Sequence, residues 1–403
     1  MNRVLLRTGP LFVAGLLGVS LLGAPTPAAS GDDLDFLTDA PAPGDPTHST
    51  DPRFKKVAAG LHDGHAFGPR IRQDGAWVAY GVREEKKGTF KTAFYARPLE
   101  GDGMFRTIWP NQHPSFDEGE GTASFTDLVG FEWTGNGDHN AMVVLHKTKG
   151  EEVLLETMNV RFTGSGAQNQ PAISGDGGQV VAVSESEDGT QTDLWVAPTG
   201  NAAEPLQLTF TRESERVPRW HPKKEQLIYE LRNPLGGDIW VFDLSTFEAK
   251  PLVRWGTSDE VLPSYSPKGD AFAFLSNKDD PDGVRWDLFV NRPGDSLPKA
   301  VVRNVRRSEK STGYAWDPLG RYVVSVLDDE AKGYPVVIAP VDGSAEPRAL
   351  VDTTDNMDPQ MVEVGGMARL VWVALDMDRP ADRRFRIVYV TDFDLATLGD
   401  APK

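Results

Sequence analysis

The sequence predicts an all-β protein, a single β-propeller of seven four-stranded blades, with six blades as the alternative. A unit of about 45 residues recurs along the chain, and each unit contains four short segments with the composition of strands. No segment shows the 3.6-residue periodicity of an amphipathic helix. The 40 glycines and 30 prolines agree with a protein of many turns. Four strands in a unit of this length, repeated along the chain, are typical of a propeller.

Residues 1–29 have the organisation of a secretory signal peptide. Arg3 and Arg7 precede an apolar stretch at 11–22, and small residues follow as far as Ala29. That stretch is shorter than the roughly 20 residues of a membrane-spanning helix, so an uncleaved anchor is the less favoured alternative. Residues 30–52 are acidic and rich in proline, which predicts a disordered linker. We therefore expect the protein in the periplasm, with secretion from the cell as the alternative.

One repeat, at residues 218–253, shows the blade pattern clearly. It starts with Pro218-Arg-Trp220-His-Pro222, where a short strand ends in a turn. The apolar run Leu227-Ile-Tyr229 has the composition of a strand that is buried on both faces. A third strand at Asp238-Ile-Trp240-Val241 and a fourth at Pro251-Leu-Val253 complete the unit.

The same pattern places seven repeats in a propeller of residues 53–395, followed by a C-terminal tail at 396–403. The last repeat lacks a fourth strand of its own, and the segment 54–59, ahead of the first repeat, has the composition to supply it. Such an N-terminal strand would close the ring, because it pairs the sheet edge that is otherwise open. The repeats are marked by a proline, or by the residue in its place, at Pro69, Phe131, Pro171, Pro218, Pro263, Tyr314 and Pro359.

Charge and cysteine content exclude several function classes. The formal net charge of −17 disfavours binding to nucleic acid and to anionic membrane surfaces, which both require basic residues. A cation or a basic protein segment is electrostatically easier to bind. The absence of cysteine excludes disulfides, thiolate catalysis and a lipidated N-terminal cysteine.

The recurring Pro-x-Trp/Tyr-Ser-Pro-x-Gly, apolar run and Asp-Ile-Trp-Val pattern resembles the WD40-like repeat of the TolB family. It is clearest at Pro263-Ser-Tyr265-Ser-Pro267-Lys-Gly269, and the resemblance extends over residues 60–393. It implies an extracytoplasmic propeller, often a protein-binding scaffold of the bacterial envelope. TolB itself has an α/β domain ahead of its propeller, and this sequence has only about 35 residues there. Peptidases with similar repeats carry a hydrolase domain after the propeller, and no Gly-x-Ser-x-Gly motif is present here.

The residues that precede the innermost strand of each blade form a candidate binding site. In a propeller these residues ring the mouth of the central channel, where ligands commonly bind. Three or four positions ahead of the repeat prolines they are mostly acidic, with Lys310 as the exception. Converging carboxylates would attract a cation or a basic segment of a protein partner. The candidate binding residues are His65, Asp127, Gln168, Glu215, Asp259, Glu260, Asp355 and Asn356.

Other features point more weakly to chemistry. His62 and His65 could begin a metal site, and the acidic loops at 185–189 and 277–283 could hold calcium, although solvated loops are the favoured explanation for all three. We predict no catalytic residue, cofactor or resident metal. The favoured function is a non-enzymatic scaffold that binds an envelope or secreted protein. The alternatives are a metal-dependent lyase or lactonase acting on a sugar acid, and a structural component of an envelope or motility assembly.

Overall fold

The computed structural model describes the propeller and leaves residues 1–53 outside the described part. The predicted signal peptide and linker therefore lie outside the described residues. None of the helices in the described part has the length and hydrophobicity to span a membrane. The described residues are 54–57, 64–71, 75–86, 89–99, 106–107, 122–123, 129–133, 141–145, 168–174, 179–186, 190–198, 205–280, 282–307, 313–351 and 353–399.

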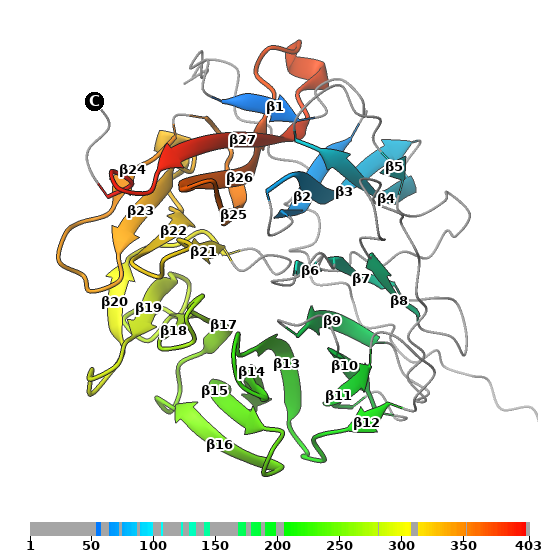
Figure 1. The fold of residues 1–403 in the computed structure, drawn as a ribbon, viewed down its shortest axis with the longest axis vertical. Helices are drawn as coiled ribbons and strands as arrows, with labels where there is room; N and C mark the ends of the chain where they lie inside the picture. The colour runs from blue at the N-terminus through cyan, green and yellow to red at the C-terminus, as the bar shows by residue number, and fades with distance from the viewer. Residues whose placement is uncertain are drawn as a thin grey trace, which may run out of the picture. The chain divides into compact units, whose positions relative to one another are not determined.

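The described residues form antiparallel sheets arranged around a central axis (Figure 1). Six of the sheets have four strands. In sequence order, three of these are β2 (His65–Ile71), β3 (Trp77–Lys86), β4 (Thr89–Pro98) and β5 (Arg106–Thr107); β9 (Gln168–Ile173), β10 (Gln179–Glu185), β11 (Thr192–Pro198) and β12 (Leu206–Gln207); and β13 (Ser214–Trp220), β14 (Gln226–Asn233), β15 (Gly236–Asp243) and β16 (Glu248–Val253).

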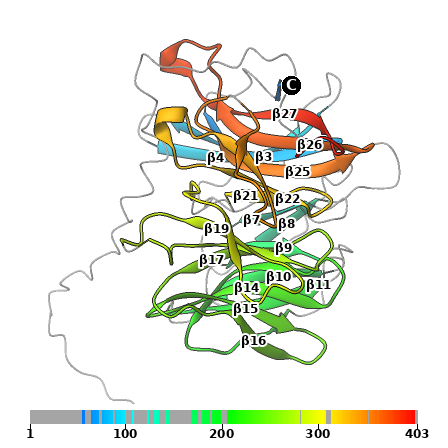
Figure 2. The same ribbon diagram turned by 90° about the vertical axis from the view of Figure 1, so that its left-hand side faces the viewer.

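The other three four-stranded sheets come from the C-terminal half, and one of them takes its fourth strand from the N-terminus. They are β17 (Glu260–Tyr265), β18 (Phe272–Ser276), β19 (Asp287–Asn291) and β20 (Lys299–Val302); β21 (Tyr314–Trp316), β22 (Tyr322–Val326), β23 (Val336–Pro340) and β24 (Arg348–Ala349); and β25 (Met357–Val364), β26 (Met367–Leu375), β27 (Arg386–Asp394) and β1 (Lys55–Val57). The side view shows these sheets from their edges (Figure 2).

The repeat around Phe131 forms a smaller sheet in the described part of the chain. Its three strands are β6 (Thr122–Ala123), β7 (Val129–Trp133) and β8 (Ala141–Leu145). β6 contacts β2 and β7 contacts β9, so this sheet lies between the first and the next four-stranded sheet. The predicted all-β propeller is confirmed. The structure has six four-stranded blades, the number taken above as the alternative, together with this three-stranded sheet.

Helix is almost absent from the described residues, as the sequence predicts. It is limited to two 3₁₀ turns, η1 (Glu330–Lys332) and η2 (Ala381–Arg383). The second strand of each blade is buried on both faces, as at Leu227, Ile228 and Tyr229, which are at most 1% exposed. Burial of this kind supplies most of the hydrophobic stabilisation of the fold.

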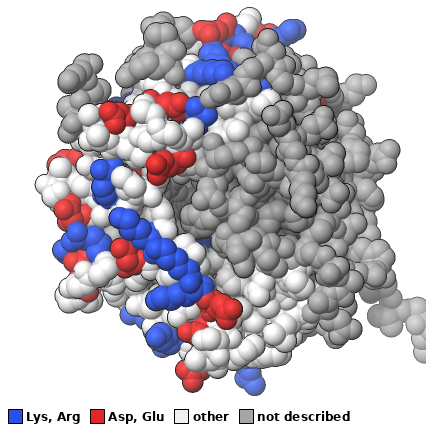
Figure 3. Space-filling view, in the orientation of Figure 1, with Lys and Arg blue, Asp and Glu red and all other residues white. Residues whose placement is uncertain are grey.

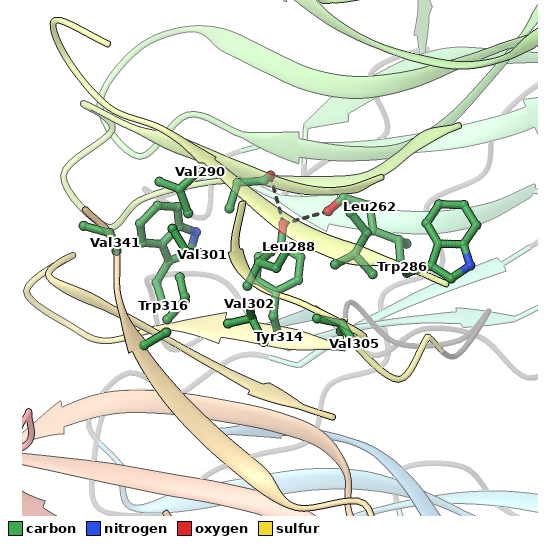
Figure 4. Close-up of a cluster of buried hydrophobic side chains, with 14 of the residues drawn as sticks. Leu262, Trp286, Leu288, Val290, Val301, Val302, Val305, Tyr314, Trp316 and Val341 are labelled. Carbon is green, nitrogen blue, oxygen red and sulfur yellow. Dashed lines mark hydrogen bonds between the residues drawn. The ribbon is translucent and has the colours of Figure 1, made fainter. Parts of the chain in front are cut away.

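Apolar side chains pack between neighbouring blades. Between the β17–β20 and β21–β24 sheets, Leu288, Val302 and Trp316 belong to one buried cluster (Figure 4). The hydroxyl group of Tyr314 lies 2.7 Å from the carbonyl oxygen of Leu262 and 2.9 Å from that of Ala273. This hydroxyl therefore joins the innermost strand of one blade to the preceding blade, as the dashed lines in Figure 4 show.

A β-bulge interrupts the innermost strand of five blades, directly before the repeat proline. The strand register shifts there, and the residue before the proline has a left-handed φ of 49–54°. Residues other than glycine rarely adopt this conformation. The five bulge residues are Gly68, Gln170, Val217, Leu262 and Asp358.

Two pairs of these bulges are joined by hydrogen bonds across blades. The Val217 N–H donates to Gln170 Oε1 at 2.7 Å, and the Gly68 N–H donates to Asp358 Oδ2 at 2.9 Å. In both cases a bulge side chain accepts the N–H of the bulge residue in the next four-stranded blade. The bulges therefore contribute to the contact between innermost strands.

The N-terminal strand closes the ring, as the sequence predicts. β1 pairs antiparallel with β27, and Val57 lies opposite Val388. The Lys56 Nζ donates to Asp376 Oδ1 at 2.5 Å and also contacts the carboxylate of Asp378. Asp376 is only 3% exposed, so Lys56 neutralises a buried carboxylate.

Replacing Lys56 by Met should lower the free energy of unfolding by about 2 kcal/mol, because Asp376 would lose its closest cation while remaining buried. The control is Lys250→Met, since Lys250 is exposed on β16 and its replacement should cost about 0.5 kcal/mol or less. Urea unfolding of the two variants measures the difference. Equal losses would show that the Lys56 ion pair does not stabilise the closing strand.

Candidate functional site

The innermost strands β2, β13, β17 and β25 all begin at the same end of the propeller. Because each blade is antiparallel, the turns that join second and third strands lie at that end as well. A contact confirms this for the β17–β20 blade, since the Asp259 N–H, ahead of β17, donates to Asn277 Oδ1 in the β18–β19 turn at 2.9 Å. We call this end, with the loops that lead into the innermost strands, the mouth face.

The sequence-predicted site residues in the described part lie at the mouth face. His65, Gln168 and Glu260 are the first residues of β2, β9 and β17, and Glu215 is the second residue of β13. Asp259, Asp355 and Asn356 lie just ahead of their strands. Asp127 and Lys310 lie outside the described residues, as does the side chain of Gln168. A role of these residues in binding stays a prediction.

Glu215 and Glu260 are not exposed at the mouth but buried between blades. Both side chains have no exposed surface. Glu215 Oε1 accepts a hydrogen bond from the Thr211 hydroxyl at 2.8 Å, and Oε2 has no hydrogen-bond partner in the described part of the chain. Burial, together with the nearby charge of Asp193, raises the pKa of Glu215 to about 7, although the hydrogen bond from Thr211 opposes the shift.

Glu260 is more fully bonded than Glu215. Its Oε1 accepts hydrogen bonds from the hydroxyl groups of Ser258 at 2.6 Å and Ser276 at 3.0 Å. Burial nevertheless raises its pKa, and the charge of Asp238 adds to this effect. Asp193 and Asp238 lie near the start of β11 and β15, the third strands of the preceding blades. A glutamate on an innermost strand and an aspartate on the preceding blade therefore lie close together at two blade junctions.

Two aspartates of the predicted ring, Asp259 and Asp355, lie in the described residues, and both are paired with arginine. Asp259 Oδ1 accepts hydrogen bonds from Arg232 Nη1 at 2.6 Å and from the Gly237 N–H at 2.8 Å. Asp355 is buried and binds Arg306 Nη1 at 2.8 Å and Arg386 Nε at 2.6 Å. Burial alone would raise the pKa of Asp355, but the charges of Arg386 and Arg306 outweigh it and hold this pKa below the ordinary value.

Asn356 and His65 are also engaged inside the protein. The Asn356 side-chain amide donates to the carbonyl oxygens of Tyr334 at 2.9 Å and Thr353 at 2.6 Å. His65 Nδ1 accepts the Arg386 N–H at 3.2 Å, and its ring packs edge-on against Phe385. Burial and the charge of Arg386 lower the pKa of His65 to about 4, so the imidazole is neutral at physiological pH.

The mouth face also carries arginines that the sequence analysis missed. Arg232 Nε lies 3.1 Å from Oε1 of the buried Glu230, and the positive charges of Arg216 and Arg307 also act on this carboxylate. The Arg307 guanidinium lies 4.4 Å from the ring of Trp286, and that of Arg306 lies 3.6 Å from the ring of Tyr334. The expected ring of open carboxylates is therefore replaced by buried or paired carboxylates among arginines.

Basic residues are unevenly distributed over the surface. On the face that Figure 3 shows, Lys and Arg side chains form a run that extends toward the centre of the molecule. The formal charge of −17 is thus not spread evenly, and local surfaces of opposite sign exist. A local basic surface can bind an acidic group despite the negative charge of the whole protein.

Three of the large exposed apolar side chains lie at the mouth face. Phe210 is 76% exposed in the β12–β13 loop, Leu235 is 65% exposed in the β14–β15 turn, and Val284 is 77% exposed in the β18–β19 turn. Phe247 and Leu297, which are 59% and 65% exposed, lie in turns at the opposite end. Exposed apolar residues beside arginines are typical of protein-binding surfaces.

The other candidate sites of the sequence have simpler explanations or lie outside the description. In the loop 277–283, Asp280 Oδ2 accepts the N–H groups of Val284 and Arg285, and Asp279 pairs with Arg303 at 3.1 Å. His62 and most of the acidic loop at 185–189 lie outside the described residues. The described part contains no group of three or more His, Asp or Glu residues arranged to hold a metal ion.

Comparison with solved structures shows which fold this architecture belongs to. Oligogalacturonate lyase of Vibrio parahaemolyticus matches with a TM-score of 0.54 and 11% identity, over 82% of this chain and 90% of the lyase. A puromycin-hydrolyzing peptidase of Mycobacterium tuberculosis matches with a TM-score of 0.55 and 13% identity, over 83% of this chain and 52% of the peptidase. The chain has the β-propeller fold of these proteins.

TolB of Acinetobacter baumannii is also matched, with a TM-score of 0.42 and 13% identity, over 81% of this chain and 87% of TolB. At these identities the likeness concerns the fold and not the activity. No family model matches the chain, and no curated protein matches its sequence.

The buried Glu215 makes a prediction about stability and pH. Its pKa is about 7 in the folded protein and 4.5 as the ordinary value, so the folded state holds a proton that the unfolded state releases. The stabilisation from this proton is complete below pH 4.5 and is lost as the pH rises through 7.

Glu215→Gln should therefore raise the free energy of unfolding by about 2 kcal/mol near pH 8 and change it little near pH 4.5. Urea unfolding at the two pH values, with the exposed Glu225→Gln as the control, measures the effect. A gain that is the same at both pH values would contradict the assignment of the proton to Glu215.

Proposed function

We propose that the protein is an exported, non-enzymatic propeller scaffold that binds a protein partner of the cell envelope, or a secreted one, on its mouth face. The observation that carries the proposal is the combination of Phe210, Leu235 and Val284 on three loops of one face. Large apolar side chains in exposed loops are costly in water, and a partner that covers them gains hydrophobic free energy.

The rigid surroundings of these loops support the same proposal. Leu235 follows Asn233, whose Oδ1 accepts the Leu235 N–H at 2.8 Å, and the Val284 N–H is bound by Asp280 at 2.8 Å. Turns held in this way lose little conformational entropy when a partner binds, which favours affinity. The arginines of the mouth face agree with the composition of interface hot spots, in which arginine is enriched.

The two alternative functions, an enzyme and a structural component, require different residues and surfaces of the protein. A metal-dependent lyase or lactonase would use His65, whose Nδ1 already accepts the Arg386 N–H, so only its Nε2 is left for a ligand. Metal analysis of the purified protein tests this alternative, and about one equivalent of bound metal would favour it. A structural component of a larger assembly would bury blade edges rather than the mouth face.

The scaffold function is tested by comparing how well variants of the mouth face and of the opposite end recover the partner. Crosslinking in intact cells and purification of the tagged protein should recover one envelope or secreted protein in quantity. The double variant Phe210→Ser with Leu235→Ser should reduce its recovery about tenfold or more, because truncated hot spots cost over 1 kcal/mol each.

The control is Phe247→Ser, which removes an exposed phenylalanine at the opposite end. It should leave recovery unchanged, and thermal unfolding should show that all variants fold. Equal recovery with the mouth-face double variant and with the control would refute binding at the mouth face.

A further inference from the structure

The loop from β12 to β13 carries the exposed Phe210 between two threonine residues. Phe210 is 76% exposed, whereas Thr209 is only 4% exposed and Thr211 is partly buried. The Thr209 hydroxyl accepts the Leu194 N–H at 2.8 Å, and the Thr211 hydroxyl donates to Glu215 Oε1 at 2.8 Å. The position of Phe210 therefore depends on hydrogen bonds that its two neighbours make inside the protein.

The two threonines connect this loop to a pair of buried acids between the β9–β12 and β13–β16 sheets. The Thr209 hydroxyl lies 3.5 Å from Asp193 Oδ1, and Thr211 binds Glu215. Asp193 on β11 is 5% exposed, and Glu215 on β13 has no exposed surface. The negative charge of Asp193 acts on Glu215, so two groups of the same charge type are buried beside the loop.

The surroundings of Glu215 supply hydroxyl groups rather than cations. Glu215 lies opposite Leu231 and therefore faces the preceding blade, whereas Arg216, the next residue, lies opposite Glu230 and faces the other side of the sheet. Within the described residues no lysine or arginine pairs with Glu215. The ionisable groups nearest to it in the described part include Asp193 on β11, Tyr229 on β14, and Arg212 and Glu213 on the loop.

Glu260 occupies the equivalent position at the next junction, but both of its carboxylate oxygens are bonded. Oε1 accepts the hydroxyl groups of Ser258 and Ser276, and Oε2 accepts the Trp255 N–H at 3.3 Å. Glu215 Oε2, in contrast, has no hydrogen-bond partner in the described part of the chain. An ionised Glu215 would hold an unsatisfied buried oxygen beside a second acid, which is costly unless water reaches it.

The ionisation of Glu215 falls within the physiological pH range. Burial and the charge of Asp193 raise its pKa from 4.5 to about 7, against the hydrogen bond from Thr211. If the loop moves away and water enters, this pKa returns toward 4.5. The closed loop is therefore stabilised fully below pH 4.5, and this stabilisation is lost as the pH rises through 7.

We propose that the protonation of Glu215 controls the loop that carries Phe210, so that the mouth face binds its partner under mildly acidic conditions and releases it under mildly alkaline ones. The inference rests on the proposed scaffold function and adds its regulation. With Glu215 protonated, Thr209 and Thr211 hold Phe210 in the position described above. With Glu215 ionised, the loop opens to admit water, and Phe210 leaves that position.

A fluorine label at Phe210 reports on the loop without any partner. para-Fluorophenylalanine replaces Phe210 in the full chain, and fluorine NMR spectra are recorded from about pH 5.5 to about pH 8.5. We expect the resonance to change with a midpoint near pH 7. The ratio of open to closed loops should rise about tenfold or more over this range. The same label at Phe247, in a turn at the opposite end, should show no such transition.

Three variants assign the transition to the acid pair. Glu215→Gln mimics the protonated carboxyl, so the label should keep its acidic-pH resonance throughout. Asp193→Asn removes the neighbouring negative charge, so the midpoint should move to lower pH. Glu225→Gln is the control, because it removes an exposed carboxylate and should titrate like the native protein.

Two results would overturn the inference. One is a resonance of the label at Phe210 that is the same at both ends of the pH range in the native protein. The other is a transition that persists unchanged in Glu215→Gln or keeps its midpoint in Asp193→Asn. Thermal unfolding checks that the variants fold, and Asp193→Asn decides the question by itself if Glu215→Gln does not fold.

Partner capture at about pH 6 and about pH 8 separates this inference from the function on which it rests. The native protein should recover its partner several-fold less well at the higher pH, and Glu215→Gln should recover it equally at both. Equal recovery by the native protein at both pH values, with loss in the Phe210 and Leu235 variant, would refute the regulation and leave the scaffold intact. A native protein that recovers no partner at either pH would refute the scaffold itself.

Discussion

The mouth face depends on one seam of the molecule, the pairing of β1 with β27. A ring of sheets exposes an unpaired strand edge unless its last sheet takes a strand from the other end of the chain. At the same seam, the Arg386 N–H reaches His65 Nδ1 at 3.2 Å and the Gly68 N–H reaches Asp358 Oδ2 at 2.9 Å. The two ends of the repeat array therefore meet at one mouth.

The mouth face contains buried carboxylates that are paired with arginines. Asp355 between Arg306 and Arg386, and Glu230 beside Arg232, are carboxylates that the fold compensates with arginine. Such pairs need precise placement, because a buried charge without its partner costs several kcal/mol. Exposed apolar side chains in loops of the same face complete the surface that we propose to bind a protein partner.

Local patterns predicted much of the fold. Turn residues and apolar runs identify strands such as β13, β14 and β15, because strand periodicity and turn chemistry act over a few residues. The closing strand was predictable from the rule that sheet edges must be paired. The bulges were not, because a left-handed residue such as Val217 is held in place by contacts from another blade.

The sequence predicted where the candidate residues lie, but it did not predict that their carboxylates are buried or paired. Glu215 and Glu260 stand at the starts of innermost strands as expected, yet packing of whole sheets buries them. Arg216 meets Glu230 across a strand pair, which no spacing along the chain reveals. The central claim is tested most directly by a photo-crosslinking residue at Leu235, with one at Phe247 as the reference, in living cells. The account predicts one crosslinked protein from Leu235 alone, and equal crosslinking from both positions would contradict it.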